Sequence, residues 1–382
     1  MNYHAIRVRR PWARAADRVS SQLLSGTPQH GPSAVAVGVS EGEHEPFTLA
    51  RGHARVLGDV GHLEHPVPLV EEPVFDVGSV TKVVVTSALV MTLADRGRLL
   101  LDTPVAHWLD GFSGAGKDAV TVRDLLEHQG GLWEWWPTYC AEPPAEAAEL
   151  LQSLPLRYEP GSGRHYSDLG FLLLGEIIAR ELGEKLAVAA RREVFEPLGL
   201  GATGYRAASA PGAADRVVAT SRGDWYEKRM LVRGSPYPVP VSSDAFTGWR
   251  THVLVGEAND GNCWHGFGGV AGHAGLFTTA QDLLLFGRAL LASIEGTGPW
   301  STAVVEAFLR PGRDPCQGLG FRVTRGDTGV LVGHPGFPGA HFAIAPDRRR
   351  VVVLLTNRLH TSGEPRPVDA AWSQLLKELE GA

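Results

Sequence analysis

The stretch Val77-Gly78-Ser79-Val80-Thr81-Lys82, VGSVTK, opens the most apolar run of the chain, VVVTSALVMTLA at residues 83–94. Its β-branched residues would by propensity alone favour a strand. Apolar and small residues nevertheless recur at steps of three and four between Val80 and Ala94, and Gly97 supplies a stop signal after them. The spacing therefore predicts a helix over residues 79–97.

On such a helix Ser79 lies in the first turn and Lys82 one turn later, so both side chains project from one face. A serine hydroxyl becomes nucleophilic when a neighbouring base takes its proton, and lysine is a base only where burial lowers its pKa. Arginine could not replace it, because guanidinium keeps its proton. The pair is therefore a candidate nucleophile and base; the alternative is a helix-capping Ser79 beside a Lys82 that extends to solvent.

Two further polar motifs adjoin apolar segments. Tyr166-Ser167-Asp168 stands where a polar loop enters the helix predicted over residues 168–182, which would hold a phenol and a carboxylate at the helix start. His334-Pro335-Gly336, within VGHPGFPGAHFAIAP, stands at the predicted entrance to a strand. Both are further candidates for an active site.

Together these motifs resemble the serine β-lactamase and penicillin-binding-protein superfamily, in particular its class C-like esterases and D-aminopeptidase-type hydrolases. Residues 79–82 look like the family's S-x-x-K motif, residues 166–168 like its Y-x-N motif, and residues 334–336 like the H-x-G variant of its K-T-G motif. Segments at 120–132, 194–205 and 268–291 are also similar to the family, in the same order. The resemblance covers roughly residues 33 to 360.

The resemblance implies a role for each matching residue. Ser79 would attack a carbonyl and form an acyl-enzyme, while Lys82 and Tyr166 would share the general-base work. The backbone N–H groups of Ser79 and Phe337 would form the oxyanion hole. A catalytically silent member would be expected to lose these residues, and the chain keeps them.

Departures from the family pattern concern the supporting residues Asp168, His334 and Gly336. Asp168 replaces a frequent asparagine, and a carboxylate near Lys82 would raise the pKa of that lysine and shift the base role toward Tyr166. His334 replaces the family's strand lysine and is charged only when protonated, so we expect it to titrate in the range about pH 6 to 7. His334 would therefore bind a substrate carboxylate more weakly than the lysine does, which argues against efficient β-lactamase activity.

Strand and helix patterns indicate one α/β domain of the α+β type. Strands are expected at residues 33–42, 45–56, 339–346 and 351–358, and helices at 11–25, 79–97, 121–129, 145–153, 168–182, 187–196, 280–292 and about 367–380. Strands at both ends predict an antiparallel sheet flanked by helices, with an all-α lobe inserted. The resulting β-lactamase/transpeptidase-like domain would span 1–382, with an α/β lobe at about 1–75 and 270–382 and a helical lobe at about 76–269.

Composition restricts the possible partners. A formal net charge of −6 over 382 residues argues against nucleic acid. The longest apolar run is shorter than the about 20 residues that span a bilayer, and no apolar segment of a signal peptide follows the N-terminal arginines. We therefore expect no membrane association and a cytoplasmic location, with the oligomeric state open.

The sequence offers no metal or cofactor motif. His62, Glu64 and His65 lack the H-E-x-x-H spacing of a zinc site, and Cys140, Cys263 and Cys316 lie far apart, as in a protein of a reducing compartment. No G-x-S-x-G nucleophile elbow occurs. The Asp260 and Asn262 pair in GEANDGNC resembles a block of some family members and is expected to be structural.

An aromatic cluster, LWEWWPTYC, follows Gly130-Gly131. Aromatic residues crowded on a loop wall a pocket or pack as a lid, since exposing them all would cost solubility. Either arrangement favours an apolar or aromatic substrate portion. The candidate substrate-binding residues are Trp133, Trp135, Trp136 and Tyr139.

The leading functional hypothesis is a serine hydrolase that acts on a small ester or amide through a Ser79 acyl-enzyme. An acyltransferase that passes the acyl group to an amine or alcohol in small-molecule biosynthesis is the close alternative, because the same base can deprotonate either acceptor. A ligand-binding member without activity is a further alternative.

Overall fold

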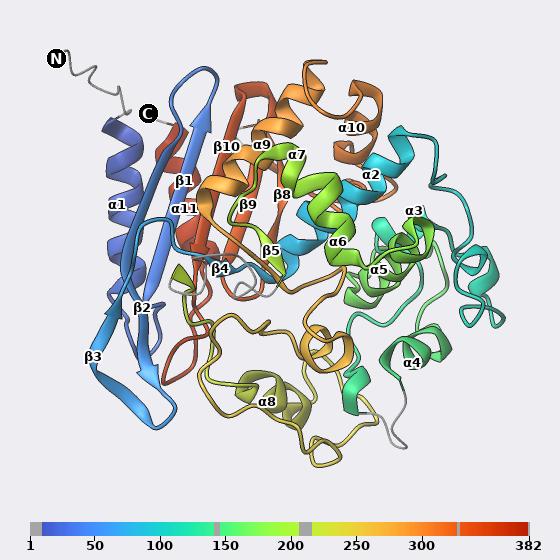
Figure 1. Ribbon diagram of the computed structural model, residues 1–382, viewed down its shortest axis with the longest axis horizontal. Helices are drawn as coiled ribbons and strands as arrows, with labels where there is room; N and C mark the ends of the chain where they lie inside the picture. The colour runs from blue at the N-terminus through green and yellow to red at the C-terminus, as the bar shows by residue number, and fades with distance from the viewer. Residues whose placement is uncertain (1–9, 141–145, 206–215, 327–328, 381–382) are drawn as a thin grey trace.

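The two ends of the chain build one antiparallel sheet. The computed structural model describes residues 10–140, 146–205, 216–326 and 329–380. The sheet has the strand order β3-β2-β1-β10-β9-β8-β7 (Figure 1). Its strands are β1 (Ala34–Glu41), β2 (Phe47–Gly58), β3 (Gly61–Pro68), β7 (Arg322–Gly326), β8 (Gly329–Gly336), β9 (Ala340–Ala345) and β10 (Arg350–Thr356).

The central pair, β1 and β10, joins the N-terminal hairpin to the C-terminal strands. Their register runs from Val35 opposite Thr356 to Glu41 opposite Arg350, and the last pair is an ion pair at 2.7 Å. Both strands are rich in valine and are buried almost throughout, because helices cover both faces of the sheet. The predicted antiparallel sheet flanked by helices is confirmed.

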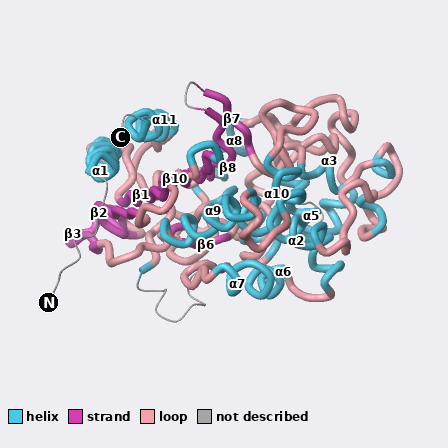
Figure 2. The backbone as a smooth tube through the Cα atoms, turned by 90° about the horizontal axis from the view of Figure 1, so that it is seen from above, coloured by secondary structure: helices cyan, strands magenta, loops and turns pink. Residues whose placement is uncertain are grey.

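Helices α1 (Arg10–Leu24) and α11 (Asp369–Glu380) pack side by side on one face of the sheet, and α9 (Ala280–Ile294) covers the other (Figure 2). Alternate side chains of β1, such as Val35 and Val37, join the core beneath α1 and α11. On the opposite face α9 approaches closely at Gly287, where a Cβ atom would lie 2.5 Å from Val351. The sheet is thus held between two layers of helix.

The middle of the chain is largely helical, with one small sheet. The three-stranded sheet has the order β4-β6-β5, formed by β4 (Phe75–Asp76), β5 (Gly204–Tyr205) and β6 (Leu276–Thr278). The helices are α2 (Ala88–Asp95), α3 (Val122–Leu126), α4 (Ala147–Ser153), α5 (Asp168–Leu182), α6 (Leu186–Ala190), α7 (Glu196–Leu198), α8 (Trp225–Arg233) and α10 (Thr302–Leu309). Of these, α8 and α10 were not expected from the sequence.

The helix predicted over residues 79–97 is irregular. A 3₁₀ turn at Gly78–Val80 leads into a π-helical segment at Lys82–Ser87 and then into α2. β-Branched side chains crowd a regular helical turn, and π segments are frequent at functional sites. By length and composition Gly78–Asp95 could cross a bilayer, but 83% of it is buried inside the protein, as in a core helix.

His334-Pro335-Gly336 ends a strand rather than entering one, so that prediction is wrong. The three residues close β8, and Pro335 lies opposite His341 of β9. The strand was missed because its glycines and proline lower the strand propensity of the segment. The motif therefore lies at the end of β8, just before the turn that leads into β9.

We predict that His360→Gln makes the protein less sensitive to acid. His360 is fully buried, and its Nε2 atom accepts the N–H groups of Val56 and Leu57, each at 3.1 Å. Burial, with nearby arginine charges, lowers the pKa of His360 to about 3, so its stabilising contribution is complete above the ordinary value of 6.5 and is lost as the pH falls toward 3.

A glutamine oxygen can accept the same N–H groups without titrating. Thermal unfolding measured from about pH 7 down to about pH 4 should show a smaller loss of Tm for His360→Gln than for the wild type, by several degrees. The control His62→Gln, on the exposed strand β3, should behave as the wild type. Equal acid sensitivity of His360→Gln and wild type would contradict the assignment.

Candidate active site

Two glycines bring the end of β8 against the Ser79 turn. Gly78 has a φ of 49°, and a Cβ atom there would lie 2.5 Å from Pro338 Cδ and 3.3 Å from the backbone nitrogen of Phe337. A Cβ atom on Gly336 would lie 2.1 Å from the carbonyl oxygen of Val77. Only glycine permits this approach. It places the Phe337 N–H beside the Ser79 segment, where the sequence predicts an oxyanion hole.

Lys82 is a completely buried cation surrounded by polar groups. Its Nζ atom lies 2.9 Å from Ser79 Oγ, 2.7 Å from Asp168 Oδ1 and 3.3 Å from the carbonyl oxygen of His273. An ammonium group has three N–H donors, and these three acceptors lie within reach of them together with the Tyr166 hydroxyl. The structure therefore brings Ser79, Lys82 and Asp168 together, as the sequence predicts, and adds His273.

The pKa of Lys82 follows from a competition between burial and charge. Burial lowers it, but Asp168 and Tyr166 raise it by attraction and hydrogen bonding, so that the pKa lies above the ordinary 10.5. The expectation that Asp168 raises this pKa is confirmed. The lowering of the pKa that a lysine base requires is therefore absent in the resting site, because the carboxylate is close enough to outweigh desolvation.

Tyr166 completes this group of residues. Its ring centroid lies 5.0 Å from Lys82 Nζ, 4.6 Å from the His128 ring and 5.8 Å from the His334 ring. Burial raises the pKa of Tyr166, while attraction to Lys82 and hydrogen bonding with Lys82 and Ser79 oppose the increase. The resting site therefore holds a phenol, an ammonium and a carboxylate.

His334 remains neutral at physiological pH. Its Nδ1 atom donates to the carbonyl oxygen of Pro335 at 2.6 Å, since a carbonyl can only accept. Burial, and then the charge of Lys82, lowers the pKa of His334 to about 3. The expectation that His334 titrates between pH 6 and 7 is wrong, because the imidazole is enclosed beside a permanent cation.

A cavity of about 660 Å³ opens over Ser79, and both polar and apolar side chains line it. Tyr166, Asp168, His334 and Phe337 all contribute to it. The other charged residues that line it are Asp76, Arg164, Asp224, Glu227, Asp260, Arg322, Arg358 and Asp369. Acidic and basic side chains therefore face the space beside the nucleophile together with apolar ones such as Met230 and Phe337, so an apolar substrate portion stays a prediction.

Only one tryptophan of the aromatic cluster lines this cavity. Trp135 does so, and its backbone N–H donates a hydrogen bond to the Tyr237 hydroxyl oxygen at 2.9 Å. Trp133 instead donates to the carbonyl of Pro155 and packs edge-on against Trp136. These two residues form part of a packed wall, so they do not fit the predicted substrate-binding role.

Tyr139 likewise does not line the cavity. Its hydroxyl donates to Glu227 at 2.5 Å, and its ring contacts Phe246, Trp249 and His265. Tyr139 can therefore influence the cavity only through the carboxyl group of Glu227. Trp135 is therefore the member of the cluster that lines the cavity, although it is itself largely buried, while Trp133, Trp136 and Tyr139 pack against other aromatic rings.

Sequence reasoning missed His273 and treated Asp260 as structural. His273 sits in the glycine-rich segment GGVAGHAG, and its polar ring among small residues was the only signal available. Asp260 lines the cavity and pairs with His273 at 2.8 Å. Over the part of the chain that the structure describes, no group of three or more His, Cys, Asp or Glu residues could hold a metal ion.

A profile of the β-lactamase family matches residues 21–376, which is nearly the whole chain. The chain belongs to the β-lactamase family. Its relatives include the N-acetylmuramyl-L-alanine amidase of Bacillus subtilis, 28% identical over 86% of this chain and 78% of the relative. A putative D-alanyl-D-alanine carboxypeptidase of Escherichia coli is 27% identical over 82% of this chain and 76% of the relative.

Solved structures confirm the β-lactamase/transpeptidase-like fold. A penicillin-binding protein homologue from Caulobacter crescentus superposes with a TM-score of 0.68 at 23% identity, over 97% of both chains. The D-amino acid amidase of Ochrobactrum anthropi superposes with a TM-score of 0.67 at 19% identity, over 97% of this chain and 99% of that one. The β-lactamase family to which the chain belongs is a family of serine hydrolases.

We predict that Asp168→Asn shifts the pH dependence of Ser79 acylation toward lower pH. Asp168 raises the pKa of Lys82, and the asparagine keeps an oxygen acceptor while removing the charge. The Lys82–Tyr166 pair must lose a proton before it can act as a base, so acylation rises with pH and the rise should begin earlier in the variant.

The measurement is the rate of acylation by a nitrophenyl ester across the pH range in which the enzyme stays folded. Asp102→Asn is the control, because Asp102 pairs with Arg123 at 2.6 Å and does not line the cavity. A profile for Asp168→Asn that coincides with the wild type, or moves to higher pH, would rule out control of Lys82 by this carboxylate.

Proposed function

We propose that the protein is a serine hydrolase that cleaves a small polar amide or ester through an acyl-enzyme on Ser79. The observation that carries the proposal is the contact of 2.9 Å between Ser79 Oγ and the buried Lys82 Nζ, at the floor of an accessible cavity. A lysine that merely extended to solvent would not be completely buried. A serine that merely capped the helix would not need this partner.

The chemistry begins with the proton of Ser79. Once the Lys82–Tyr166 pair has lost a proton, it accepts the hydroxyl proton as Ser79 Oγ attacks the substrate carbonyl. The backbone N–H groups of Ser79 and Phe337 stabilise the resulting oxyanion. The same pair returns the proton to the leaving group, and a water molecule then releases the acid by the reverse sequence.

Asp168 and His334 support this sequence in different ways. Asp168 keeps Lys82 an ammonium in the resting state, so Tyr166 is the group through which the pair exchanges its proton with Ser79. His334 is a neutral group whose Nδ1–H is already used by Pro335, which leaves Nε2 free to accept a hydrogen bond from a substrate N–H or O–H.

Two observations favour a polar amide as the substrate. Charged side chains of both signs line the cavity, which fits a substrate with polar groups on both sides of the scissile bond. The relatives include an amidase and a putative carboxypeptidase, and both names describe the cleavage of amide bonds. Transfer of the acyl group to an amine or alcohol is the competing outcome of the same intermediate.

The deciding experiment combines covalent labelling with product analysis. A fluorophosphonate should modify Ser79, as identified by peptide mapping, and Ser79→Ala should abolish the modification. Ser87→Ala is the control, because this buried serine lies on the same helical segment and its hydroxyl has no partner. Modification elsewhere, or of no serine, would refute the nucleophile.

Product analysis then separates hydrolysis from transfer. A panel of N-acyl amino acid amides, dipeptides and nitrophenyl esters is incubated with and without millimolar amines or alcohols, and products are identified by mass spectrometry. Hydrolase activity predicts free acid from amides and esters alike. Products that carry the added acceptor, formed faster than free acid, would instead establish an acyltransferase.

We predict that Lys82→Arg lowers the acylation rate by about 10² or more, the usual size of a general-base contribution. Arginine keeps the positive charge but cannot give up a proton. Lys117→Arg is a matched control, because Lys117 is also a buried lysine, 4% exposed, and donates to the carbonyl of Gln152 at 2.7 Å. Turnover close to wild type in Lys82→Arg would mean that Lys82 acts only through its charge.

A further inference from the structure

The third partner of Lys82 comes from a part of the chain that the catalytic motifs do not include. The carbonyl oxygen of His273 lies 3.3 Å from Lys82 Nζ and belongs to the glycine-rich loop that leads into β6. Ser79 and Asp168 approach the same atom from other directions. The place of Nζ relative to Ser79 Oγ therefore depends on where this loop holds one carbonyl group.

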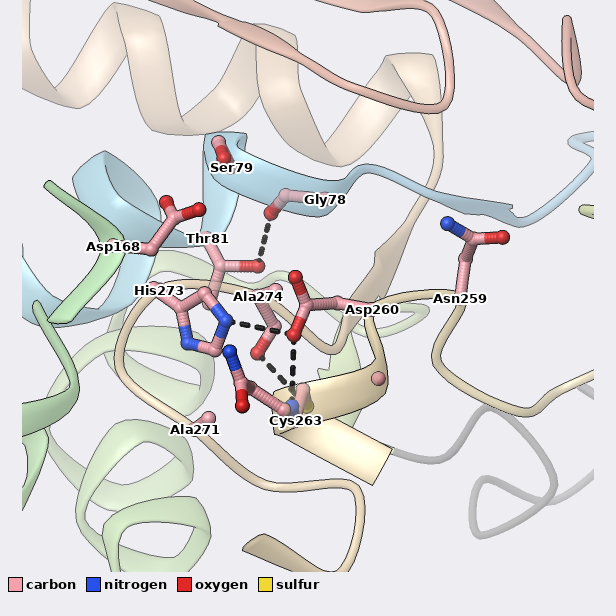
Figure 3. A network of polar contacts seen from close by, with 12 residues as sticks. Gly78, Ser79, Thr81, Asp168, Asn259, Asp260, Cys263, Ala271, His273 and Ala274 are labelled. Carbon is pink, nitrogen blue, oxygen red and sulfur yellow. Dashed lines mark hydrogen bonds and ion pairs between the residues drawn. The ribbon is translucent and has the colours of Figure 1, made fainter. Parts of the chain in front are cut away.

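The His273 side chain fixes the residue whose carbonyl contacts Lys82. It is 1% exposed, and its Nε2 atom lies 2.8 Å from Asp260 Oδ1, which also accepts the backbone N–H of Cys263 at 2.8 Å (Figure 3). A carboxylate can only accept, so the proton lies on Nε2 of His273. The other ring nitrogen, Nδ1, is buried without a hydrogen-bond partner. Asp260 is thus the side chain that anchors the His273 ring.

Asp260 is itself tied to the nucleophile segment. The N–H of the preceding residue, Asn259, donates to Asp76 Oδ2 at 2.8 Å, and the N–H of Gly78 donates to Asp76 Oδ1 at 2.9 Å. One carboxylate therefore joins the turn that carries Ser79 to the segment that carries Asp260. The contacts form a closed path from Gly78 through Asp76, Asp260 and His273 back to Lys82.

The charge of Asp260 is maintained in this setting. Burial alone would raise the pKa of Asp260, but attraction and hydrogen bonding by His273, the N–H of Cys263 and the charge of Lys82 hold it below the ordinary 3.8. An ionised carboxylate is a stronger acceptor than a protonated one. At neutral pH Asp260 is therefore ionised and holds His273 as a carboxylate acceptor.

We propose that Asp260 is a positioning residue: through His273 it fixes the main-chain carbonyl that holds the Lys82 ammonium beside Ser79. This inference rests on the proposed function, in which Lys82 and Tyr166 exchange the proton of Ser79. Asp260 and His273 do not handle that proton. They set the direction in which Lys82 presents its N–H groups.

The rival explanation is that these residues only stabilise the loop. Other contacts anchor it nearby: Thr86 Oγ1 donates to the carbonyl of Gly272 at 2.6 Å, and the Tyr205 hydroxyl donates to that of Ala271 at 2.8 Å. Neither carbonyl contacts Lys82. Thr86→Val is therefore a matched control, since it removes an anchor of the adjacent residue in the same loop without touching the path to Lys82.

The expected results follow from the chemistry of each replacement. His273→Ala and Asp260→Ala should lower the Ser79 acylation rate by about 10- to 100-fold, the cost of a small misplacement of a catalytic group, while KM changes little for His273→Ala. His273→Gln keeps an N–H donor within reach of Asp260, and Asp260→Asn keeps an oxygen acceptor. Both should recover most of the rate.

A second readout follows Lys82 without any substrate. The chain has five lysines, so a protein labelled with ¹⁵N-lysine gives few side-chain signals, and Lys82→Arg identifies that of Lys82. His273→Ala should shift or broaden this signal and leave that of Lys117 unchanged, and His273→Gln should restore it. Asp260→Ala, at a residue on the cavity wall, gives the same test if His273→Ala does not fold.

The proposal is overturned if Thr86→Val slows acylation as much as His273→Ala, if His273→Gln is no better than His273→Ala, or if the Lys82 signal is the same in all variants. A wild-type protein in which Ser79 is not acylated would refute the proposed function instead. In that case the Lys82 signal still decides whether Asp260 and His273 position the ammonium.

Discussion

The fully buried ammonium of Lys82 is the constraint on which the rest of the site depends. A charge taken out of water costs several kcal/mol unless it is paired and hydrogen-bonded. Its three acceptors come from three separate parts of the chain: Ser79 on the same helical segment, Asp168 at the start of α5, and the His273 carbonyl before β6. Satisfying one cation therefore fixes the helical region, the nucleophile turn and the small sheet relative to one another.

This arrangement also decides how the base must work. With Asp168 at 2.7 Å, Lys82 keeps its proton in the resting protein, and burial keeps Tyr166 a phenol. Neither group alone is poised to accept a proton, so the proposed mechanism requires that the two act as a coupled pair from which one proton has been lost. In that mechanism the tight ion pair of Lys82 and Asp168 sets the pH at which acylation begins.

Much of this site could be predicted because its members are close in sequence or belong to recognisable motifs. The spacing of Ser79 and Lys82 was enough to bring those two residues together, and the resemblance of residues 166–168 to the family's Y-x-N motif added Asp168. The pKa of Lys82 could not be predicted, because burial and the carboxylate act in opposite directions and only the distance decides between them. His273 was missed since a main-chain carbonyl leaves no signal in the sequence.

Some elements of the fold could likewise be predicted from the sequence, and others could not. The helices at 168–182 and 280–292 were predicted to within a few residues because their apolar periodicity is regular. Strand β8 was missed because its glycines and proline resemble those of a turn, and of its two neighbours in the sheet β9 was predicted and β7 was not. In the aromatic cluster, the sequence could not show which of the three tryptophans lines the cavity. Trp135 does so, whereas Trp133 and Trp136 pack against each other, and this depends on tertiary contacts.

Chemistry and substrate choice depend on different parts of the molecule. Ser79, Lys82 and Tyr166 sit on a buried helical segment and a helix start, and Phe337 follows a strand in the centre of the fold. The opposite wall of the cavity includes the segment around α8, which contributes Asp224, Tyr226, Glu227 and Met230. That helix was not evident from the sequence, although its Tyr226, Glu227 and Met230 line the space that a substrate would enter. Membership of the family therefore supports the proposed acyl-enzyme chemistry and says little about which amide is the substrate.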